Sequence, residues 1–149
     1  MAKLILTAHY IPVVGAGKAR WNSVHVHDLS ELYLLLVEAA VAGKLTKGLW
    51  GEQGYYLAEN GEHTWTELAE TMAREAHGLG YVGTLEKREL SKEAALQQAG
   101  FEAVSWGLNS RGKAERAQRL LNWSPSAPSI EQEAPNILKD EHARLAKSA

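Results

Sequence analysis

The chain has 149 residues, and 45% hydrophobic with 23% charged residues is the composition of a globular protein with one core, which excludes a disordered chain. A formal net charge of −2, with Lys and Arg scattered among Glu, leaves no basic surface for nucleic acid. The absence of cysteine excludes a disulfide framework and a thiolate nucleophile, and it fits the cytoplasm. We therefore expect a single domain over residues 1–149.

The first apolar stretch runs from Leu4 to Val14 and is too short to span a bilayer. No small-residue cleavage pattern follows it, so we expect neither a membrane anchor nor a signal peptide here. Pro12 would end a helix at or before Ile11.

A glycine-containing turn follows at Gly15-Ala16-Gly17-Lys18. It lacks the third glycine of a dinucleotide-binding turn, and Arg20-Trp21 stands where the phosphate-binding helix would begin. The segment therefore predicts a plain surface turn, and we expect no nucleotide cofactor.

Residues 23–27 alternate, with Val24 and Val26 on one side and His25 and His27 on the other. A period of two predicts a short strand whose two imidazoles face the same way.

Asp28 is expected to cap the next helix, with Glu31 as its partner in a capping box. This helix should run from Leu29 to about Ala42 and end at Gly43. Because it is apolar on nearly every side, it has to be covered all round.

Residues 54–58 predict a second strand, and Asn60-Gly61 predicts a turn. Thr64 and Glu67 form a second capping-box pattern, which opens a helix that runs to about His77.

The rest of the chain predicts a loop at residues 78–84, helices at 91–99 and 110–121 with a break at Gly100, and a capping signal at 129–132. Pro125 and Pro128 exclude helix between the helix at 110–121 and the capping signal at 129–132. The charged end from Lys139 is expected to fray. The predicted fold class is α/β, mostly helical, with a few short strands.

Four motifs follow one another along the chain: residues 20–29 (RWNSVHVHDL), 54–65 (GYYLAENGEHTW), 109–111 (NSR) and 117–125 (AQRLLNWSP). Together they resemble the C-terminal, substrate-side half of an extended short-chain dehydrogenase/reductase of the NAD-dependent epimerase/dehydratase type, in a subgroup common in fungi. The resemblance covers roughly residues 4–135. It implies that the N-terminal end is the tail of a helix leading to an extended segment, and that the nucleotide-binding half of the family's fold is missing.

The family's Tyr-x-x-x-Lys pair is also missing from this sequence, so we do not expect hydride transfer by this chain alone. The resemblance implies that the helix at 29–42 lies on a parallel sheet supplied by the missing half. Exposing one apolar face of such a helix would cost on the order of 10 kcal/mol, comparable to the stability of a domain. We expect a homodimer to cover it, by packing or by exchange of elements, and a separate polypeptide carrying the other half is the alternative.

His25 and His27 are the candidate catalytic residues, and His27 stands where the resembled family usually has Asp. Two imidazoles at this spacing can act as acid and base or share a metal. No third metal ligand is evident, so we expect no metal. The alternative is a structural hydrogen bond below the helix cap.

Arg20 corresponds, by resemblance, to an arginine that reaches an anionic part of the substrate, and its alternative is a surface ion pair. Arg111 stands near a predicted helix start, where a guanidinium opposes the helix dipole. It is therefore expected to meet an anion or a carboxylate.

Five aromatic residues complete the substrate-binding candidates. Trp21, Trp65 and Trp106 are expected either to wall an apolar pocket or to lie in the core. Tyr55 and Tyr56 are neighbours on a predicted strand, so one ring should face inward, where its phenol would reach a ligand or pack in the core.

Three functions are compatible with these features. We favour a free-standing enzyme that binds a small molecule and performs a non-redox step, such as isomerisation, cyclisation or dehydration, in secondary metabolism. A non-catalytic interaction module and a piece of an NAD(P)-dependent dehydrogenase or epimerase are the alternatives.

Overall fold

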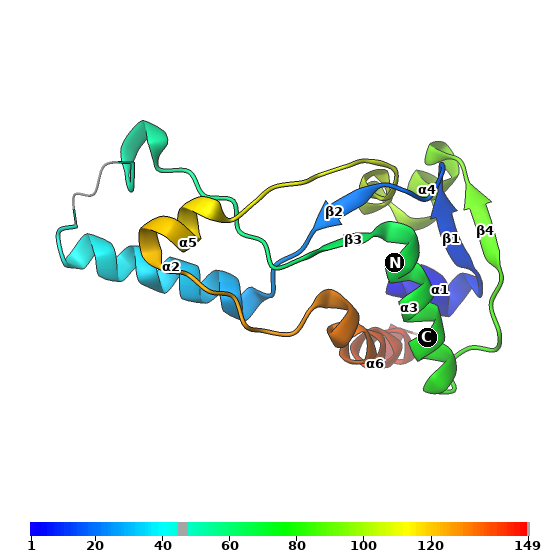
Figure 1. Ribbon diagram of the computed structural model, residues 1–149. Helices are drawn as coiled ribbons and strands as arrows, with labels where there is room; N and C mark the ends of the chain where they lie inside the picture. The colour runs from blue at the N-terminus through cyan, green and yellow to red at the C-terminus, as the bar shows by residue number, and fades with distance from the viewer. Residues whose placement is uncertain (45–47, 149) are drawn as a thin grey trace. The chain divides into compact units, whose positions relative to one another are not determined.

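The computed structural model describes residues 1–44 and 48–148, which fall into two compact units with separate cores (Figure 1). Unit 1 comprises residues 1–21, 63–110 and 130 onward, and unit 2 comprises residues 22–62 and 111–129. The chain crosses between these units four times along the sequence. The single domain expected over residues 1–149 stays a prediction.

Unit 1 begins with α1 (Ala2–Ala8), which ends at His9 in the left-handed conformation, and continues into β1 (Ile11–Val14). The predicted helix followed by an extended segment is confirmed. β1 pairs in parallel with β4 (Lys87–Leu90), with Ile11 opposite Lys87. β4 was not predicted, because only Leu90 of its four residues is buried and no alternation marks it.

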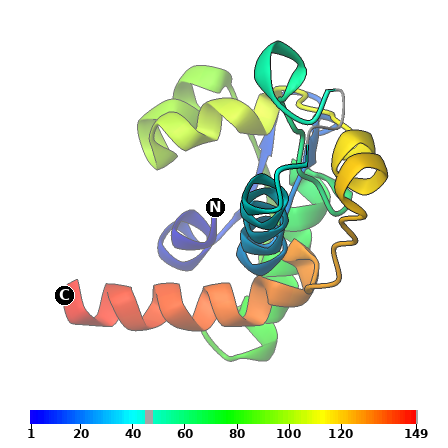
Figure 2. The same cartoon turned by 90° about the vertical axis from the view of Figure 1, so that its left-hand side faces the viewer.

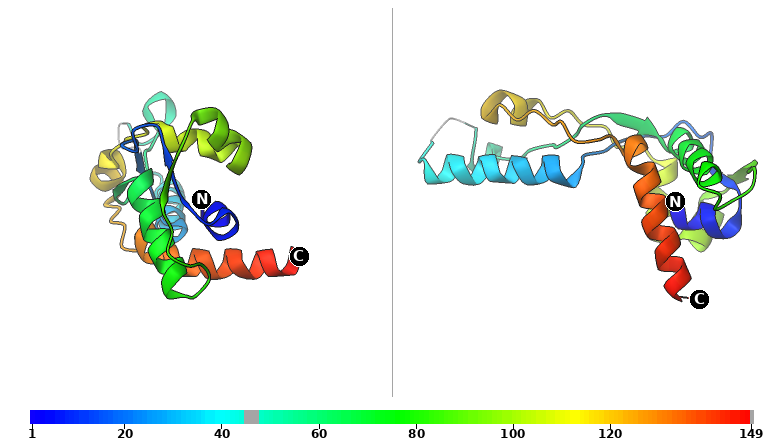
Figure 3. Two further views of the ribbon diagram at one scale, coloured as in Figure 1. Left: turned by 90° about the vertical axis from the view of Figure 1, so that its right-hand side faces the viewer. Right: turned by 90° about the horizontal axis from the view of Figure 1, so that it is seen from below.

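Three helices form the main core of unit 1, with α3 packed against α1 and α6 (Figure 3). α3 (Trp65–Gly78) begins at the predicted capping box and buries five side chains along one face, Leu68, Ala69, Met72, Ala73 and Ala76. α6 (Ile130–Ser148) does not fray at Lys139 as predicted. Leu138 is fully buried, and the ring of His142 stacks on Tyr81 at 3.9 Å between centroids, so tertiary contacts hold the helix beyond that point.

A second cluster in unit 1 surrounds Trp106. α4 (Lys92–Ala99) confirms the helix predicted at residues 91–99, and Ser91 caps it, its hydroxyl accepting a hydrogen bond from the N–H of Ala94. A 3₁₀-helix, η2 (Phe101–Gly107), follows and buries Trp106 against the end of β1.

Unit 2 is built on α2 (Val26–Val41) and α5 (Glu115–Leu121), which lie side by side, with a short 3₁₀-helix, η1 (Gly51–Gln53), between them in sequence (Figure 2). Their core consists of the buried residues Leu32, Ala114, Ala117 and Trp123. Gly43 follows α2 with a φ of 63°, as its position after the predicted helix suggested.

The predicted strand at residues 23–27 is wrong, because α2 starts three residues earlier than expected and includes His27. The strand lies upstream instead, as β2 (Arg20–Asn22), which pairs with β3 (Glu62–Thr64). Alternation of Val and His fits a strand and the first turn of a helix equally well over so few residues.

The predicted strand at residues 54–58 is also absent, since no strand is assigned there. The predicted helix at 110–121 is confirmed only as α5, from Glu115 onward. Ser110 instead forms an isolated bridge with Trp21, and the N–H of Gly112 donates to the side chain of Asn22. Pairing with a distant segment therefore keeps residues 110–114 out of the helix.

The α/β class is confirmed, with short strands and mostly helical structure. Among the residues that the structure describes, no helix is both long enough and apolar enough to cross a membrane.

Candidate functional sites

The two histidine candidates lie at the start of α2 rather than on a strand. His25 is the N-cap, and its Nδ1 accepts a hydrogen bond from the N–H of His27 at 3.1 Å. The two rings meet edge to face, with centroids 4.8 Å apart. His25 therefore satisfies one of the free N–H groups at the helix start, and only His27 faces open space.

A wide, shallow hollow of about 550 Å³ lies beside His27 in unit 2. It is lined by His27, Asp28, Ser30, Glu31, Leu34, Ser126, Ala127 and Pro128. One imidazole, one exposed carboxylate and an apolar side chain therefore share one wall. Such a surface suits a polar molecule held partly in water.

Asp28 is only 2% exposed and joins three segments of unit 2. Its carboxylate accepts hydrogen bonds from the N–H groups of Ser126 at 2.9 Å and Ala127 at 3.0 Å, and from the side chain of Asn60 at 3.4 Å. Burial alone would raise the pKa of Asp28, but these hydrogen bonds outweigh it and lower the pKa.

The sequence analysis assigned Asp28 only a capping role, and that assignment is wrong. The indole N–H of Trp123 donates to the backbone C=O of Asp28 at 2.9 Å, so the tertiary contact involves both parts of the residue. No pattern along the chain indicated this partnership, because Asp28 and Trp123 are far apart in sequence.

Tyr55 and Tyr56 face opposite ways, as the sequence analysis predicted, although no strand forms around them. Tyr56 packs against the core of unit 2 and donates its phenolic O–H to the C=O of Leu49 at 3.0 Å. The Tyr55 ring is 68% exposed.

Arg116, which the sequence analysis missed, fixes the loop that carries both tyrosines. Its guanidinium donates to the backbone C=O groups of Gly48 and Gln53, and to that of Tyr55 at 2.9 Å. It also lies 5.3 Å from the centroid of the Tyr55 ring. One guanidinium that donates to three backbone carbonyls holds this loop in place, and the arrangement can be recognised only in the folded structure.

Arg111 meets a carboxylate rather than a free anion, and it does not start a helix. Its Nε and Nη2 both donate to Glu62, the second at 3.3 Å. Of the two partners left open by the sequence, the structure shows the carboxylate.

Glu59 is a buried carboxylate of unit 2. It is 9% exposed, and its carboxylate accepts from the N–H of Gly61 at 3.1 Å and the N–H of Ala114 at 3.3 Å.

The three tryptophan candidates form a chain of ring contacts in unit 1. The centroid of Trp65 lies 5.8 Å from that of Trp21 and 6.4 Å from that of Trp106. Buried His63 meets the Trp65 ring edge to face at 5.1 Å. Trp106 is core, whereas Trp21 and Trp65 are only half-buried.

The indole N–H of Trp65 is the unusual atom of this cluster. It is buried, and it has no hydrogen-bond acceptor among the described residues. A buried donor of this kind costs free energy unless a bound molecule or water accepts from it. Trp65 is therefore the best-placed tryptophan for a polar ligand contact.

Arg20 lies close to the start of α3. Its backbone N–H donates to the side chain of Asn109 at 2.8 Å. Hydrogen bonds from Thr64 chiefly lower the pKa of Glu67, and the charge of Arg20 acts in the same direction. Arg20 therefore lies near enough to the Glu67 carboxylate for the two charges to attract.

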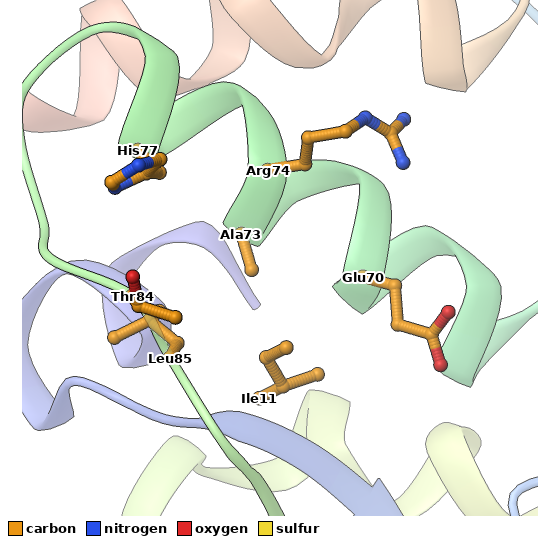
Figure 4. A pocket seen from close by; sticks show the side chains of 7 residues that line it. All are labelled: Ile11, Glu70, Ala73, Arg74, His77, Thr84 and Leu85. Carbon is orange, nitrogen blue, oxygen red and sulfur yellow. The ribbon is translucent and has the colours of Figure 1, made fainter.

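A small cavity of about 190 Å³ lies between α3, β1 and the loop before β4 (Figure 4). Its lining comprises Ile11, Glu70, Ala73, Arg74, His77, Thr84 and Leu85. His77 contacts the C=O of Val82 at 3.2 Å, and Glu70 pairs with Lys87 at 2.5 Å. The His77 and Glu70 side chains are thus engaged locally, and none of the lining residues was predicted from the sequence as a site residue.

The predicted site residues divide between the two units. Unit 1 holds Arg20, Trp21, Trp65 and Trp106, and unit 2 holds His25, His27, Tyr55, Tyr56 and Arg111. In the part of the chain that the structure describes, no group of three or more His, Asp or Glu side chains could hold a metal ion.

No family model matches the chain. A curated relative, the oxidase ucsJ of an Acremonium species, is 36% identical over 143 residues. A solved structure of RMD from Pseudomonas aeruginosa, complexed with NADPH, shares the fold with a TM-score of 0.61 at 22% identity. The chain therefore has the fold of part of an NADPH-binding protein.

The chain spans about two fifths of each of these proteins. The matches cover 91% of this chain but 40% of the oxidase, and 96% of this chain but 41% of the RMD chain. The expectation that no cofactor takes part is wrong, because the same fold occurs in a protein complexed with NADPH and the curated relative is an oxidase.

The residues described here do not by themselves fit the pyrophosphate of such a nucleotide. Dinucleotides place it at a helix N-terminus, where free N–H groups attract negative charge. Every described α-helix except the seven-residue α1 carries an acidic residue in its first turn, namely Asp28, Glu67, Glu93, Glu115, or Glu131 with Glu133. These carboxylates already complement the helix ends and would repel a phosphate.

Proposed function

We propose that the chain forms the substrate-binding part of an NADPH-dependent oxidoreductase of the short-chain dehydrogenase/reductase type, acting in secondary metabolism. The nucleotide is held mainly by a second, nucleotide-binding part. The observation that supports this proposal is that nearly the whole chain matches 41% of the length of a protein whose structure was solved in complex with NADPH.

Each unit, taken by itself, offers candidate substrate contacts. In unit 1, the half-buried Trp21 and Trp65 offer flat apolar surfaces, and the indole N–H of Trp65 is available to a substrate oxygen. Arg20 supplies positive charge for an anionic group on the substrate. In unit 2, His27 lines a hollow and is the histidine proposed for proton transfer.

The non-redox step expected from the sequence stays a prediction. Isomerisation, cyclisation or dehydration would need only positioning and proton transfer, which Arg20 and His27 are chemically able to provide. A single set of measurements separates this reaction from the redox proposal.

The test uses a chimera in which this chain replaces the matching residues of the Acremonium oxidase. We expect the folded chimera to bind NADPH and to act on the oxidase's substrate with a change in nicotinamide fluorescence. Trp65→Phe in the chimera should raise KM several-fold with little change in kcat, because it removes a substrate hydrogen bond worth about 1 kcal/mol.

Two results would contradict the proposal. One is a folded, NADPH-binding chimera that does not act on the substrate. The other is conversion of the substrate by the isolated chain with no nicotinamide present, which would favour the non-redox step instead.

A further inference from the structure

The backbone of Arg20 is held by a distant segment of unit 1. The side-chain Oδ1 of Asn109 accepts a hydrogen bond from the N–H of Arg20 at 2.8 Å, and the N–H of Ser110 donates to the C=O of Arg20 at 2.9 Å. Trp21, the next residue, forms a parallel bridge with Ser110. Both backbone polar groups of Arg20 are therefore engaged by two consecutive residues that lie far away in the sequence.

The start of α3 holds the same segment through separate contacts. The backbone N–H of Trp65, the first residue of α3, donates to the C=O of Ala19 at 3.3 Å. The turn at residues 15–18 also approaches α3, because Gly17 has a φ of 69° and a Cβ added there would lie 2.7 Å from the hydroxyl oxygen of Thr66. Glycine alone allows this conformation together with so close an approach.

These contacts fix a ring beside an exposed arginine. The centroids of Trp21 and Trp65 lie 5.8 Å apart with their planes inclined at 55°, and both indoles are half-buried. Arg20 and Asn109 are exposed, so water is able to replace the bond between them at little cost in stability. Loss of that bond mainly increases the number of directions in which the Arg20 and Trp21 side chains leave the backbone.

We infer that Asn109 is a positioning residue for the substrate contacts at Arg20 and Trp21, and that the close approach at Gly17 acts with it. This inference rests on the proposed function. A substrate that meets groups already held in place does not have to order them when it binds, so its affinity is higher. Asn109 itself touches no substrate in this assignment and acts through the backbone of Arg20.

The kinetic test uses the chimera with the Acremonium oxidase. Asn109→Ala should raise KM about fivefold and change kcat less than about twofold, because it loosens substrate contacts and leaves the reacting groups in place. In a chimera that already carries Arg20→Gln and Trp21→Leu, Asn109→Ala should add less than about a twofold change in kcat/KM, since the residues through which it acts are gone.

A spectroscopic test on the isolated chain does not depend on turnover. Two indoles this close couple their electronic transitions, and the part of the far-ultraviolet circular dichroism that Trp21→Phe removes is the Trp21 signal. Asn109→Ala should weaken the Trp21 signal about twofold, because the segment opens locally. Asn109→Asp keeps an acceptor oxygen and should retain it. Neither change should shift the melting temperature by more than about 2 °C.

Two glycines of one turn give matched variants for the contact with α3. Gly17→Ala places its Cβ against Thr66, whereas Gly15→Ala, at a similar φ of 59°, has no atom of the described chain within 4 Å of its Cβ. Both variants carry the same left-handed strain, so only the contact differs. The Trp21 signal should fall with Gly17→Ala and persist with Gly15→Ala, and equal effects would remove Gly17 from the inference.

The two tests separate the inference from the proposed function. An unchanged Trp21 signal in Asn109→Ala overturns the inference, whatever the chimera does. A weakened signal with an unchanged KM in an active chimera also overturns it, because the contact is then structural only. A weakened signal together with a folded chimera that does not act on the substrate supports the positioning of Trp21 and rejects the proposed function.

Discussion

Asp28 connects the start of α2 to two other segments of unit 2, at Asn60 and at Ser126-Ala127. Its carboxylate is buried and accepts hydrogen bonds from the backbone N–H groups of Ser126 and Ala127. Leaving a buried carboxylate without such donors costs more than the bonds contribute when they are present. Asp28 therefore determines how the chain after Trp123 is fixed to the helix.

We predict that Asp28→Asn lowers the free energy of unfolding by about 2 kcal/mol, because an amide keeps one acceptor oxygen but loses the charge. Urea unfolding at pH 7 measures the loss. Glu31→Gln, an exposed change in the same helix, is the control and should alter stability by less than about 0.5 kcal/mol. Equal effects of the two changes would show that the buried bonds of Asp28 contribute little.

The same carboxylate predicts a pH dependence. Because the folded state lowers the pKa of Asp28, the unfolded chain takes up the proton first as the pH falls. Its stabilisation is therefore complete above about pH 4, the ordinary range of an Asp, and is lost below it. Unfolding curves of the wild type and Asp28→Asn should converge between about pH 4 and pH 2. A constant difference across this range would contradict the argument.

His25 and His27 should respond differently to substitution. His25→Ala removes an N-cap and should lower the free energy of unfolding by about 1 kcal/mol, whereas His27→Ala should change it by less than about 0.5 kcal/mol. In the chimera, only His27→Ala should reduce kcat and alter its pH profile. Loss of kcat with His25→Ala alone would assign the proton transfer to the other imidazole.

At the scale of elements, α3 is the helix whose start is most fully explained by residues close to it in the sequence. Thr64 and Glu67 bond reciprocally, with the N–H of Glu67 donating to the Thr64 hydroxyl at 3.1 Å and the N–H of Thr64 donating to Glu67 at 3.3 Å. The helix that starts there supplies five buried side chains to unit 1. Its start therefore influences the whole core of that unit.

Thr64→Ala should lower the free energy of unfolding by about 1 kcal/mol, since it removes the acceptor of the capping box. Thr7→Ala is the matched control, because the Thr7 hydroxyl is exposed and bonds to Lys3 within α1 rather than at its start. That change should be neutral or slightly stabilising. Chemical denaturation of both variants measures the two changes in the free energy of unfolding. An equal loss of stability would mean that the hydroxyl at the cap has no special role.

Elements that depend on short-range signals were predicted, and those that depend on a partner were not. α3 begins at the capping residue that the sequence indicated, Thr64, and α4 begins within one residue of its predicted start at Ser91. β4 is held by a parallel partner 76 residues away in the register, at Ile11 and Lys87, and nothing local marks it. A strand forms only when a neighbouring strand pairs with it. The pattern at residues 54–58 therefore indicates a tendency to form a strand and does not ensure that one forms.

At the scale of the whole molecule, the exposed apolar face of α2 is the main feature that each unit's own core leaves unexplained. The sequence analysis expected this helix to need cover on every side, and the structure shows one face without it. The homodimer expected from the sequence stays a prediction, and so does the absence of nucleic-acid partners.

We predict that the isolated chain binds the dye ANS while keeping native near-ultraviolet circular dichroism, because the exposed surface is part of a folded state rather than a molten one. Val37→Asn with Val41→Asn should reduce the dye signal without lowering stability by more than about 1 kcal/mol, since both side chains are exposed. Light scattering on the same sample checks the state of association. Absence of dye binding with the mass of two chains would support the homodimer.

The sequence by itself determined the fold class, the cap of α3, the opposite orientations of Tyr55 and Tyr56, and the need to cover α2. These follow from side-chain periodicity and from hydrogen bonds within a few residues, which the order of residues contains directly. Only the tertiary structure decided that His25 is a cap, that Asp28 is bonded to residues 126–127, that Arg111 pairs with Glu62, and that Arg116 holds the tyrosine loop. The contacts of Asp28, Arg111 and Arg116 join groups dozens of residues apart, and they exist only once the chain has folded. The contact of His25 is local, but alternation over so few residues fits a strand and a helix start equally well.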